Sequence, residues 1–184
     1  MSQLLHTLPQ AIADRLKPLM PKIRECKGIA GRFNLERLQK ESIKTPAILV
    51  SILELKQTTP AAGPMHFFDL SMAAFIVTKD QLGLSRDEAG ANIAAALCAY
   101  VPDKRWGEPA CGEARNVRGQ SIVTAGLLKT SASLWAVTWT QPCTFATIPE
   151  PEAMGVELYL GHAPEIGAAH VNEYERIGEI PDVV

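Results

Sequence analysis

The residues best suited to metal chemistry lie near the end of the chain. His162 and His170 share one acidic segment with Glu165, Glu173 and Glu175. Imidazole and carboxylate groups bind zinc and related metals, so an open metal site is one interpretation of this segment. The two histidines are eight residues apart and lack the four-residue spacing that places two ligands on one helical face. We therefore expect histidines that are solvated or lie at an interface, with no bound metal or cofactor.

A second candidate is an acid–base pair formed by Asp87 and Glu88. Both carboxylates follow Ser85 in the sequence Ser-Arg-Asp-Glu, which is typical of a capping box at the start of a helix. Capping explains the two acidic residues without catalysis. The sequence also has no phosphate-binding glycine loop and no G-x-S-x-G motif.

The thiols give little sign of chemistry, because their spacing fits no known motif. No C-x-x-C pair occurs, so zinc and thioredoxin-type sites are disfavoured. We expect these cysteines to be reduced and mostly buried. The four are Cys26, Cys98, Cys111 and Cys143.

A small polar cluster comprises Arg115, Asn116 and Arg118. Two arginines beside an amide are compatible with a phosphate site. Exposed arginines are more common on the edge strand of a sheet or at an interface, and we favour that interpretation.

The composition restricts the class of protein. A net charge of −2 over 184 residues removes the usual electrostatic argument for nucleic-acid binding. The 47% apolar content is sufficient for a folded core, and no apolar run is long enough for a membrane span. The first residues show no secretory signal pattern, so the sequence predicts synthesis in the cytoplasm.

The stretch most typical of a central strand is SLWAVTWTQPCTF, residues 133–145. Its alternation places Trp135, Val137 and Trp139 on one face, with Leu134 and Ala136 on the other. Pro142 lacks an N–H, so it should end the strand or lie where no partner strand needs that donor. A face this rich in tryptophan must be covered by other elements.

Those other elements can be predicted from periodicity, capping residues and prolines. An amphipathic helix is expected around Leu5–Leu19, with a possible capping box from Thr7 to Gln10 and an end at Pro18. We then expect an irregular connection (22–33), a short helix (35–41), strands at 47–56 and 66–78, a helix from Ser85 to about Tyr100, a surface loop (101–112) and a strand at 115–123. In the first strand, Leu53 and Leu55 should share one face.

This order predicts an α+β fold, a mainly antiparallel sheet with helices packed on one face. Residues 1–146 form the expected domain. Residues 147–184 are acidic and rich in proline and glycine, and are expected to form a C-terminal extension or arm that orders against a partner.

Several segments resemble the tail terminator proteins of Mu-like tailed bacteriophages. The similarity runs from about residue 8 to residue 178. It is carried by SIKTPAILVSIL, SRDEAGANIAAALCAYV, ARNVRGQ, LWAVTWTQ and YLGHAPEIGAAHVNEYERIG. Family members often read ARNLY where this chain has ARNVR at 114–118, which leaves the contacts of that strand open.

The resemblance implies a structural virion protein and no enzyme. Such a subunit forms a hexameric ring on the tail tube, ends tube polymerisation and provides the surface for the head–tail connector. The implied partners are identical copies, the tube protein and the connector or neck protein. DNA would pass through an acidic or neutral lumen without sequence-specific binding, and the protein would be made in the host cytoplasm and reside in the virion.

The candidate interface residues are polar or aromatic and lie in two regions of the sequence. They are Arg115, Asn116, Arg118, Tyr159, His162, His170 and Tyr174. Three alternatives remain: a neck or head-completion protein, a small hydrolase that uses His66 or His162 with a cysteine, and a monomeric binding module.

Overall fold

The computed structural model describes residues 3–31, 43–58, 65–80, 83–122, 132–146, 156–164 and 166–180. The chain divides into two compact units, Met1–Ala146 and Thr147–Val184. The second is called the C-terminal unit below. The expected short helix at 35–41 lies outside the described residues.

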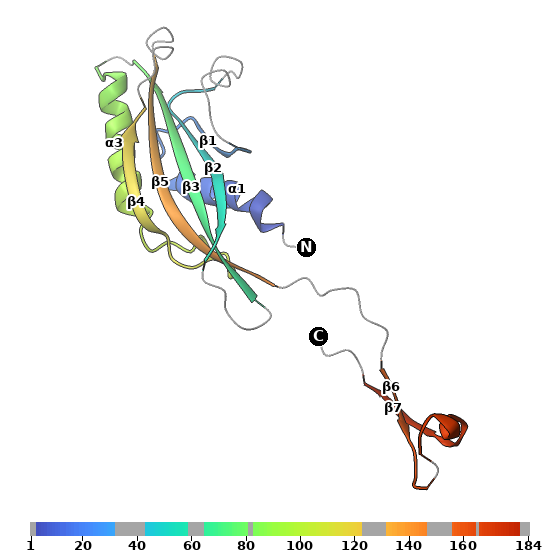
Figure 1. Ribbon diagram of the computed structural model, residues 1–184. Coiled ribbons are helices and arrows are strands. Elements are labelled where there is room, and N and C mark those ends of the chain that lie inside the picture. Colours follow the sequence, from blue (N-terminus) through green and yellow to red (C-terminus); the bar gives the residue numbers. More distant parts are fainter. Residues whose placement is uncertain are drawn as a thin grey trace. The chain divides into compact units, whose positions relative to one another are not determined.

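The first unit is an α+β fold built on one five-stranded sheet (Figure 1). The strand order is β1-β2-β3-β5-β4, in which β1 is parallel to β2 and every other pair is antiparallel. The predicted α+β class and mainly antiparallel sheet are therefore confirmed. The elements are α1 (Leu4–Leu16), η1 (Lys17–Leu19), β1 (Glu25–Gly28), β2 (Ala47–Gln57), β3 (Met65–Lys79), α3 (Arg86–Tyr100), β4 (Arg115–Ser121) and β5 (Ala132–Ala146).

Both described helices pack on the same face of the sheet. One core cluster joins Leu8 and Ile12 of α1 and Leu97 of α3 to Met72 of β3 and Trp139 of β5. The opposite face carries a second buried cluster, which includes Leu49, Phe75 and Leu134. The central strands are apolar on both faces because both are covered, and β3 pairs with β5 along the full length of each strand.

The first helix begins earlier than the sequence suggested. Gln3 is the N-cap, so Thr7 lies inside the helix and the proposed Thr7–Gln10 capping box was wrong. Leu4, Leu8, Ile12 and Leu16 form the buried face because a four-residue spacing repeats along one side of a helix. Leu5 and Leu19, expected on that face, are 41% and 49% exposed. The α-helix does end just before Pro18, as predicted.

Part of the connection at 22–33 is regular, although the sequence predicted an irregular segment. Glu25–Gly28 forms β1, which pairs in parallel with the start of β2. Gly28 allows this strand to approach α1: its N–H donates to Oε1 of Gln10 at 2.9 Å, and a Cβ there would lie 2.6 Å from the Gln10 backbone nitrogen. Four residues without clear alternation carry too little signal to identify such a strand.

A bulge changes the faces of the second half of β2. The register with β3 shifts between Ile52 and Glu54. Leu53 packs against the second cluster, on the face opposite α1 and α3, while Leu55 lies opposite Leu70, which belongs to the core on the α1 and α3 side. The prediction that Leu53 and Leu55 share one face was therefore wrong, because an extra residue in one strand inverts the alternation beyond it.

Helix α3 begins where the capping residues predicted. Oγ of Ser85 accepts from the backbone N–H of Glu88 at 3.2 Å, and Asp80 accepts from the N–H of Arg86 at 3.0 Å. The buried positions differ in part from those expected. Ala89 and Leu97 are buried as predicted, but Ile93 and Tyr100 are only half-buried, and Gly90 and Ala94 take their place against the sheet. Gly90 fits because the Trp135 ring lies directly against it.

Replacing Ser85 with alanine should lower the free energy of unfolding by about 1 kcal/mol, because one N–H of the first helical turn loses its acceptor. Ser85→Asp keeps an acceptor at the cap and should remain near wild-type stability. Urea unfolding followed by circular dichroism measures both. Equal losses in the two variants would contradict the capping role.

The loop between α3 and β4 lies largely at the surface, as predicted, but Trp106 within it is buried. Trp106 is 4% exposed and packs near Trp139, with ring centroids 6.2 Å apart. Gln141 of β5 is fully buried and makes four hydrogen bonds. Its Oε1 accepts from Nε1 of Trp106 at 2.8 Å and of Trp139 at 3.1 Å, and its Nε2 donates to the carbonyls of Lys104 and Gly112. One side chain thus fixes the loop on the sheet.

Pro142 does not end β5. The Gly112 N–H donates to the Pro142 carbonyl at 2.8 Å. In an antiparallel pair the N–H and C=O of one residue point to the same side, so the missing donor of Pro142 faces this loop and not β3. The Gly112 carbonyl accepts from Gln141 at 2.5 Å instead. Pro142 therefore lies where no partner strand needs its N–H, one of the two predicted outcomes.

Candidate functional site

The three polar residues of the first candidate region lie on β4, the edge strand of the sheet. Arg115 pairs with Thr140 and Arg118 with Thr138, so a bulge lies between them. Asn116 sits in this bulge with a positive φ of 56°, a conformation that asparagine tolerates better than most residues. Its Nδ2 donates to Oγ1 of Thr140 at 3.4 Å. All three side chains are exposed, as expected for an edge strand.

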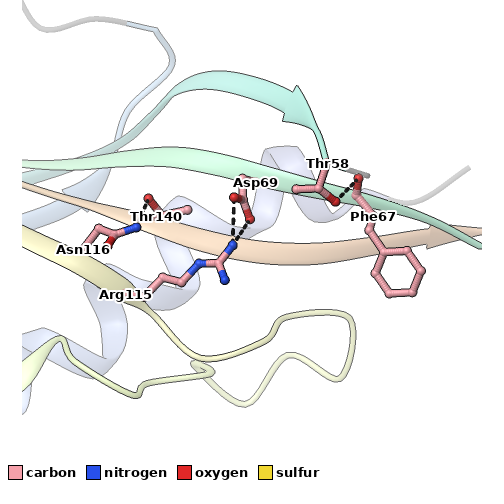
Figure 2. Close-up of polar contacts among 6 residues, drawn as sticks. All are labelled: Thr58, Phe67, Asp69, Arg115, Asn116 and Thr140. Atoms are coloured by element: carbon pink, nitrogen blue, oxygen red, sulfur yellow. Dashed lines mark hydrogen bonds and ion pairs between the residues drawn. The ribbon is translucent and has the colours of Figure 1, made fainter. Parts of the chain in front are cut away.

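Arg115 reaches across β5 to Asp69 on β3. Its Nη2 donates to both carboxylate oxygens of Asp69, at 2.9 and 2.8 Å (Figure 2). The Arg115 side chain is 55% exposed and that of Asp69 is 26% exposed. Because Arg115 lies opposite Thr140 and Asp69 opposite Pro142, the ion pair is on the face of the sheet opposite the helices.

Sequence analysis missed Asp69 as a member of this region. The signal was a single acidic residue in the apolar strand sequence HFFDLSM. Its partner could not be identified, because the register between β3, β5 and β4 brings together residues that are 46 positions apart.

Reversing one charge of this ion pair should cost little. Arg115→Asp or Asp69→Arg should each lower the free energy of unfolding by about 1 kcal/mol, because exposed pairs are screened by water. The double exchange should recover about 0.5 kcal/mol or more of the summed loss. Urea unfolding at low and high salt measures this coupling, which should shrink in high salt. Strictly additive effects would contradict a direct interaction.

A hollow of about 440 Å³ opens beside the ion pair. Its lining includes Asp69, Arg105, Arg115, the Phe67 ring and two thiols, Cys111 and Cys143. Phe67 is 42% exposed, and its carbonyl accepts from Oγ1 of Thr58 at 3.1 Å (Figure 2). The region thus offers charged groups of both signs, amide groups and an aromatic surface to a partner.

The same edge is poorly suited to binding another strand through its backbone. A bulge interrupts the regular row of peptide groups on β4. Two exposed arginines also place positive charge along this edge. A partner at this edge would therefore contact side chains, with Arg115, Asn116 and Arg118 at its centre.

The second candidate region lies in the C-terminal unit. Strands β6 (Val156–Leu160) and β7 (Glu175–Ile180) form an antiparallel pair, joined through η2 (Ala168–Glu173). Tyr159 is 51% exposed opposite Arg176. Tyr174 is half-buried: its hydroxyl accepts from the Gly167 N–H at 2.7 Å and its ring lies against Gly161. Tyr159 thus presents a surface, whereas Tyr174 organises the unit itself.

The two histidines of this unit occupy different environments. His162 is exposed just after β6, and His170 is half-buried within η2. Across the residues that the structure describes, no group of three or more His, Cys, Asp or Glu side chains is arranged to hold a metal. Glu165 lies outside that set.

The residues considered above for catalysis can each be placed in the fold. Glu88 lies in the capped first turn of α3, and His66 is exposed on β3 opposite Phe145. Cys26 donates to the Ala13 carbonyl, and burial raises the pKa of its thiol to about 11. Three of the four thiols are buried and Cys98 is partly buried, which confirms the prediction that they are mostly buried.

Comparison with known proteins adds no assignment. No family model matches the chain, and no curated protein matches its sequence. No helix in the described ranges is long and apolar enough to cross a membrane.

Proposed function

We propose that this chain is a structural subunit of a phage tail, a terminator that assembles as a ring on the tail tube. The observation that carries the proposal is the set of large apolar side chains exposed on the C-terminal unit. They are Tyr159, Leu160, Ile166, Val171 and Ile177, at 51%, 42%, 58%, 59% and 57% exposure.

Such a surface favours a role in assembly. A two-stranded antiparallel pair is only marginally stable by itself in water. Apolar side chains grouped on so small a unit mark a site of protein–protein contact. A neighbouring subunit that covers them would stabilise the unit and hold the two copies together. A ring is built from such heterologous contacts, in which two different surfaces of the subunit meet.

The segments that resemble tail terminators coincide with defined elements of the fold. SRDEAGANIAAALCAYV spans the Ser85 cap and α3, ARNVRGQ covers the start of β4, and LWAVTWTQ lies in β5. YLGHAPEIGAAHVNEYERIG runs from β6 to β7. The resemblance therefore concerns both the sheet and the unit that would contact a neighbour.

The genetic test is deletion of the gene in the phage that encodes this chain. We expect tails of uncontrolled length that do not join heads, as seen by electron microscopy. Tails of normal length that fail to join heads would instead favour the neck or head-completion alternative. Normal, complete virions would refute both.

A matched pair of substitutions tests the contact surface. Ile177→Asp should prevent ring formation on purified tubes without shifting the unfolding midpoint, because the side chain is exposed in the monomer. Leu19→Asp changes an apolar side chain of similar exposure, 49%, in the first unit and should assemble normally. Negative-stain microscopy and light scattering provide the readout, and equal assembly by both variants would contradict the proposed surface.

A further inference from the structure

Cys111, in the loop between α3 and β4, lies directly opposite Cys143 on β5. Their Sγ atoms are 3.2 Å apart, and both residues are 2% exposed. They form an isolated antiparallel bridge flanked by two hydrogen bonds, from Gly112 N to the Pro142 carbonyl at 2.8 Å and from Thr144 N to the Ala110 carbonyl at 2.9 Å.

This register suits a disulfide. The two flanking bonds identify Cys111–Cys143 as a non-hydrogen-bonded pair, in which opposite Cα atoms lie about 4.5 Å apart. Disulfides span Cα separations of about 4.4–6.8 Å. The backbone therefore already holds both cysteines within bonding range, and closure needs only a small side-chain movement.

The pair is also reachable by a small reagent. Both cysteines line the hollow beside Arg115, and that hollow is large enough for a molecule the size of hydrogen peroxide. The hydrogen bond between the two thiols lowers the pKa of Cys111 and raises the pKa of Cys143, whereas burial raises the pKa of the Cys26 and Cys98 thiols. Cys111 is thus the cysteine best placed to react first as a thiolate.

We propose that Cys111 and Cys143 are a redox-responsive thiol pair, which hydrogen peroxide converts to a disulfide that pins the loop between α3 and β4 to β5. The Cys111 thiolate attacks one peroxide oxygen and the O–O bond breaks. The departing hydroxide takes a proton to become water, and Cys111 becomes a sulfenic acid. Sγ of Cys143 then attacks Sγ of Cys111, the S–O bond breaks, and the hydroxyl group leaves with the Cys143 proton as a second water. Two thiols lose two electrons in total, and one peroxide is reduced to two waters.

The disulfide would join positions 32 residues apart and close the segment that contains β4. A cross-link over a loop of this length restricts the unfolded chain and so raises the unfolding temperature. This inference does not depend on the proposed role in the phage tail.

The test uses the purified full-length chain with and without hydrogen peroxide. Peroxide should reduce the free thiols titrated in denaturant from four to two and lower the intact mass by about 2 Da. A non-reducing peptide map should show the Cys111 peptide joined to the Cys143 peptide. The midpoint of thermal unfolding should rise by roughly 5–10 °C and return to its original value after treatment with dithiothreitol.

Variants sharpen the assignment. Cys98→Ala, at a half-buried thiol outside the pair, should still lose two thiols and gain thermal stability. Cys111→Ala and Cys143→Ala should form no intramolecular disulfide and show no rise in the midpoint. Four thiols remaining after peroxide, a disulfide between other cysteines, or a sulfinic acid on Cys111 without cross-linking would each overturn the proposal. The peptide map of the wild-type chain decides between these outcomes, so the test remains valid even if a variant fails to fold.

Discussion

Replacing Gln141 with leucine is expected to lower the free energy of unfolding by about 4 kcal/mol or more. The two side chains are similar in volume, so the loss comes from hydrogen bonds. Oε1 of Gln141 accepts from the indoles of Trp106 and Trp139, and its Nε2 donates to the Gly112 carbonyl. Each group left buried without a partner costs about 1–3 kcal/mol.

The measurement is urea unfolding followed by tryptophan fluorescence and circular dichroism. Gln57→Leu is the matched control, because Gln57 is exposed at the end of β2 and should lose less than about 0.5 kcal/mol. A change below about 1 kcal/mol in Gln141→Leu would show that the network contributes little.

A double-mutant cycle separates the indole contact from general disruption. Trp106→Phe removes one donor to Gln141. Its cost should be smaller in the Gln141→Leu background than in the wild type, with a coupling of about 1 kcal/mol or more. Independent effects would instead assign the loss to packing around residue 141.

Gly28→Ala should have a somewhat smaller effect than the loss of Gln141, about 3 kcal/mol. The new Cβ would lie 2.6 Å from the Gln10 nitrogen and 2.8 Å from the Pro9 carbonyl carbon. Both are backbone atoms of α1, so relief requires the helix to move away from β1 and open the core around Ile12. Thermal and urea unfolding both measure this loss.

Gly119→Ala is the control for a methyl group added within a strand. Its Cβ would first meet the Cys98 Sγ atom, at 3.1 Å, which belongs to a side chain that can turn aside. We expect a change of less than about 1 kcal/mol. Similar losses in the two variants would indicate that close approach to α1 is not the cause.

The central elements could be predicted from sequence because their signals are local. β-Branched and aromatic residues indicate strands β2, β3 and β5, and Ser85 with the alanine-rich run that follows indicates α3. Burial on both faces of β2 follows from its unbroken apolar start.

The errors arose where a residue's environment depends on distant parts of the chain. The burial of Trp106 was missed because its partner Gln141 lies 35 residues away. Strand β1 depends on the closeness of α1, which only Gly28 permits. Leu55 was placed on the wrong face because a bulge leaves no clear mark in the sequence.

The candidate site was predictable only where its signal is local. Exposed arginines on an edge strand follow from the composition of β4. The ion pair with Asp69 and the facing thiols depend on register, which single-sequence patterns do not determine. Tyr174 belonged to the predicted set, yet its hydrogen bond to Gly167 gives it a role within the C-terminal unit.

The long pairing of β3 with β5 affects how the chain is made. Lys79 pairs with Ala132 and Met65 with Ala146, so no part of β3 meets this neighbour until β5 has been synthesised. At ribosomal rates, the roughly 50 intervening residues take about 3–10 s to add. Throughout that delay the nascent β2–β3 hairpin leaves one edge of an apolar strand unpaired, which is a template for aggregation. Slow elongation or overexpression should therefore increase the demand for chaperones that bind extended apolar segments.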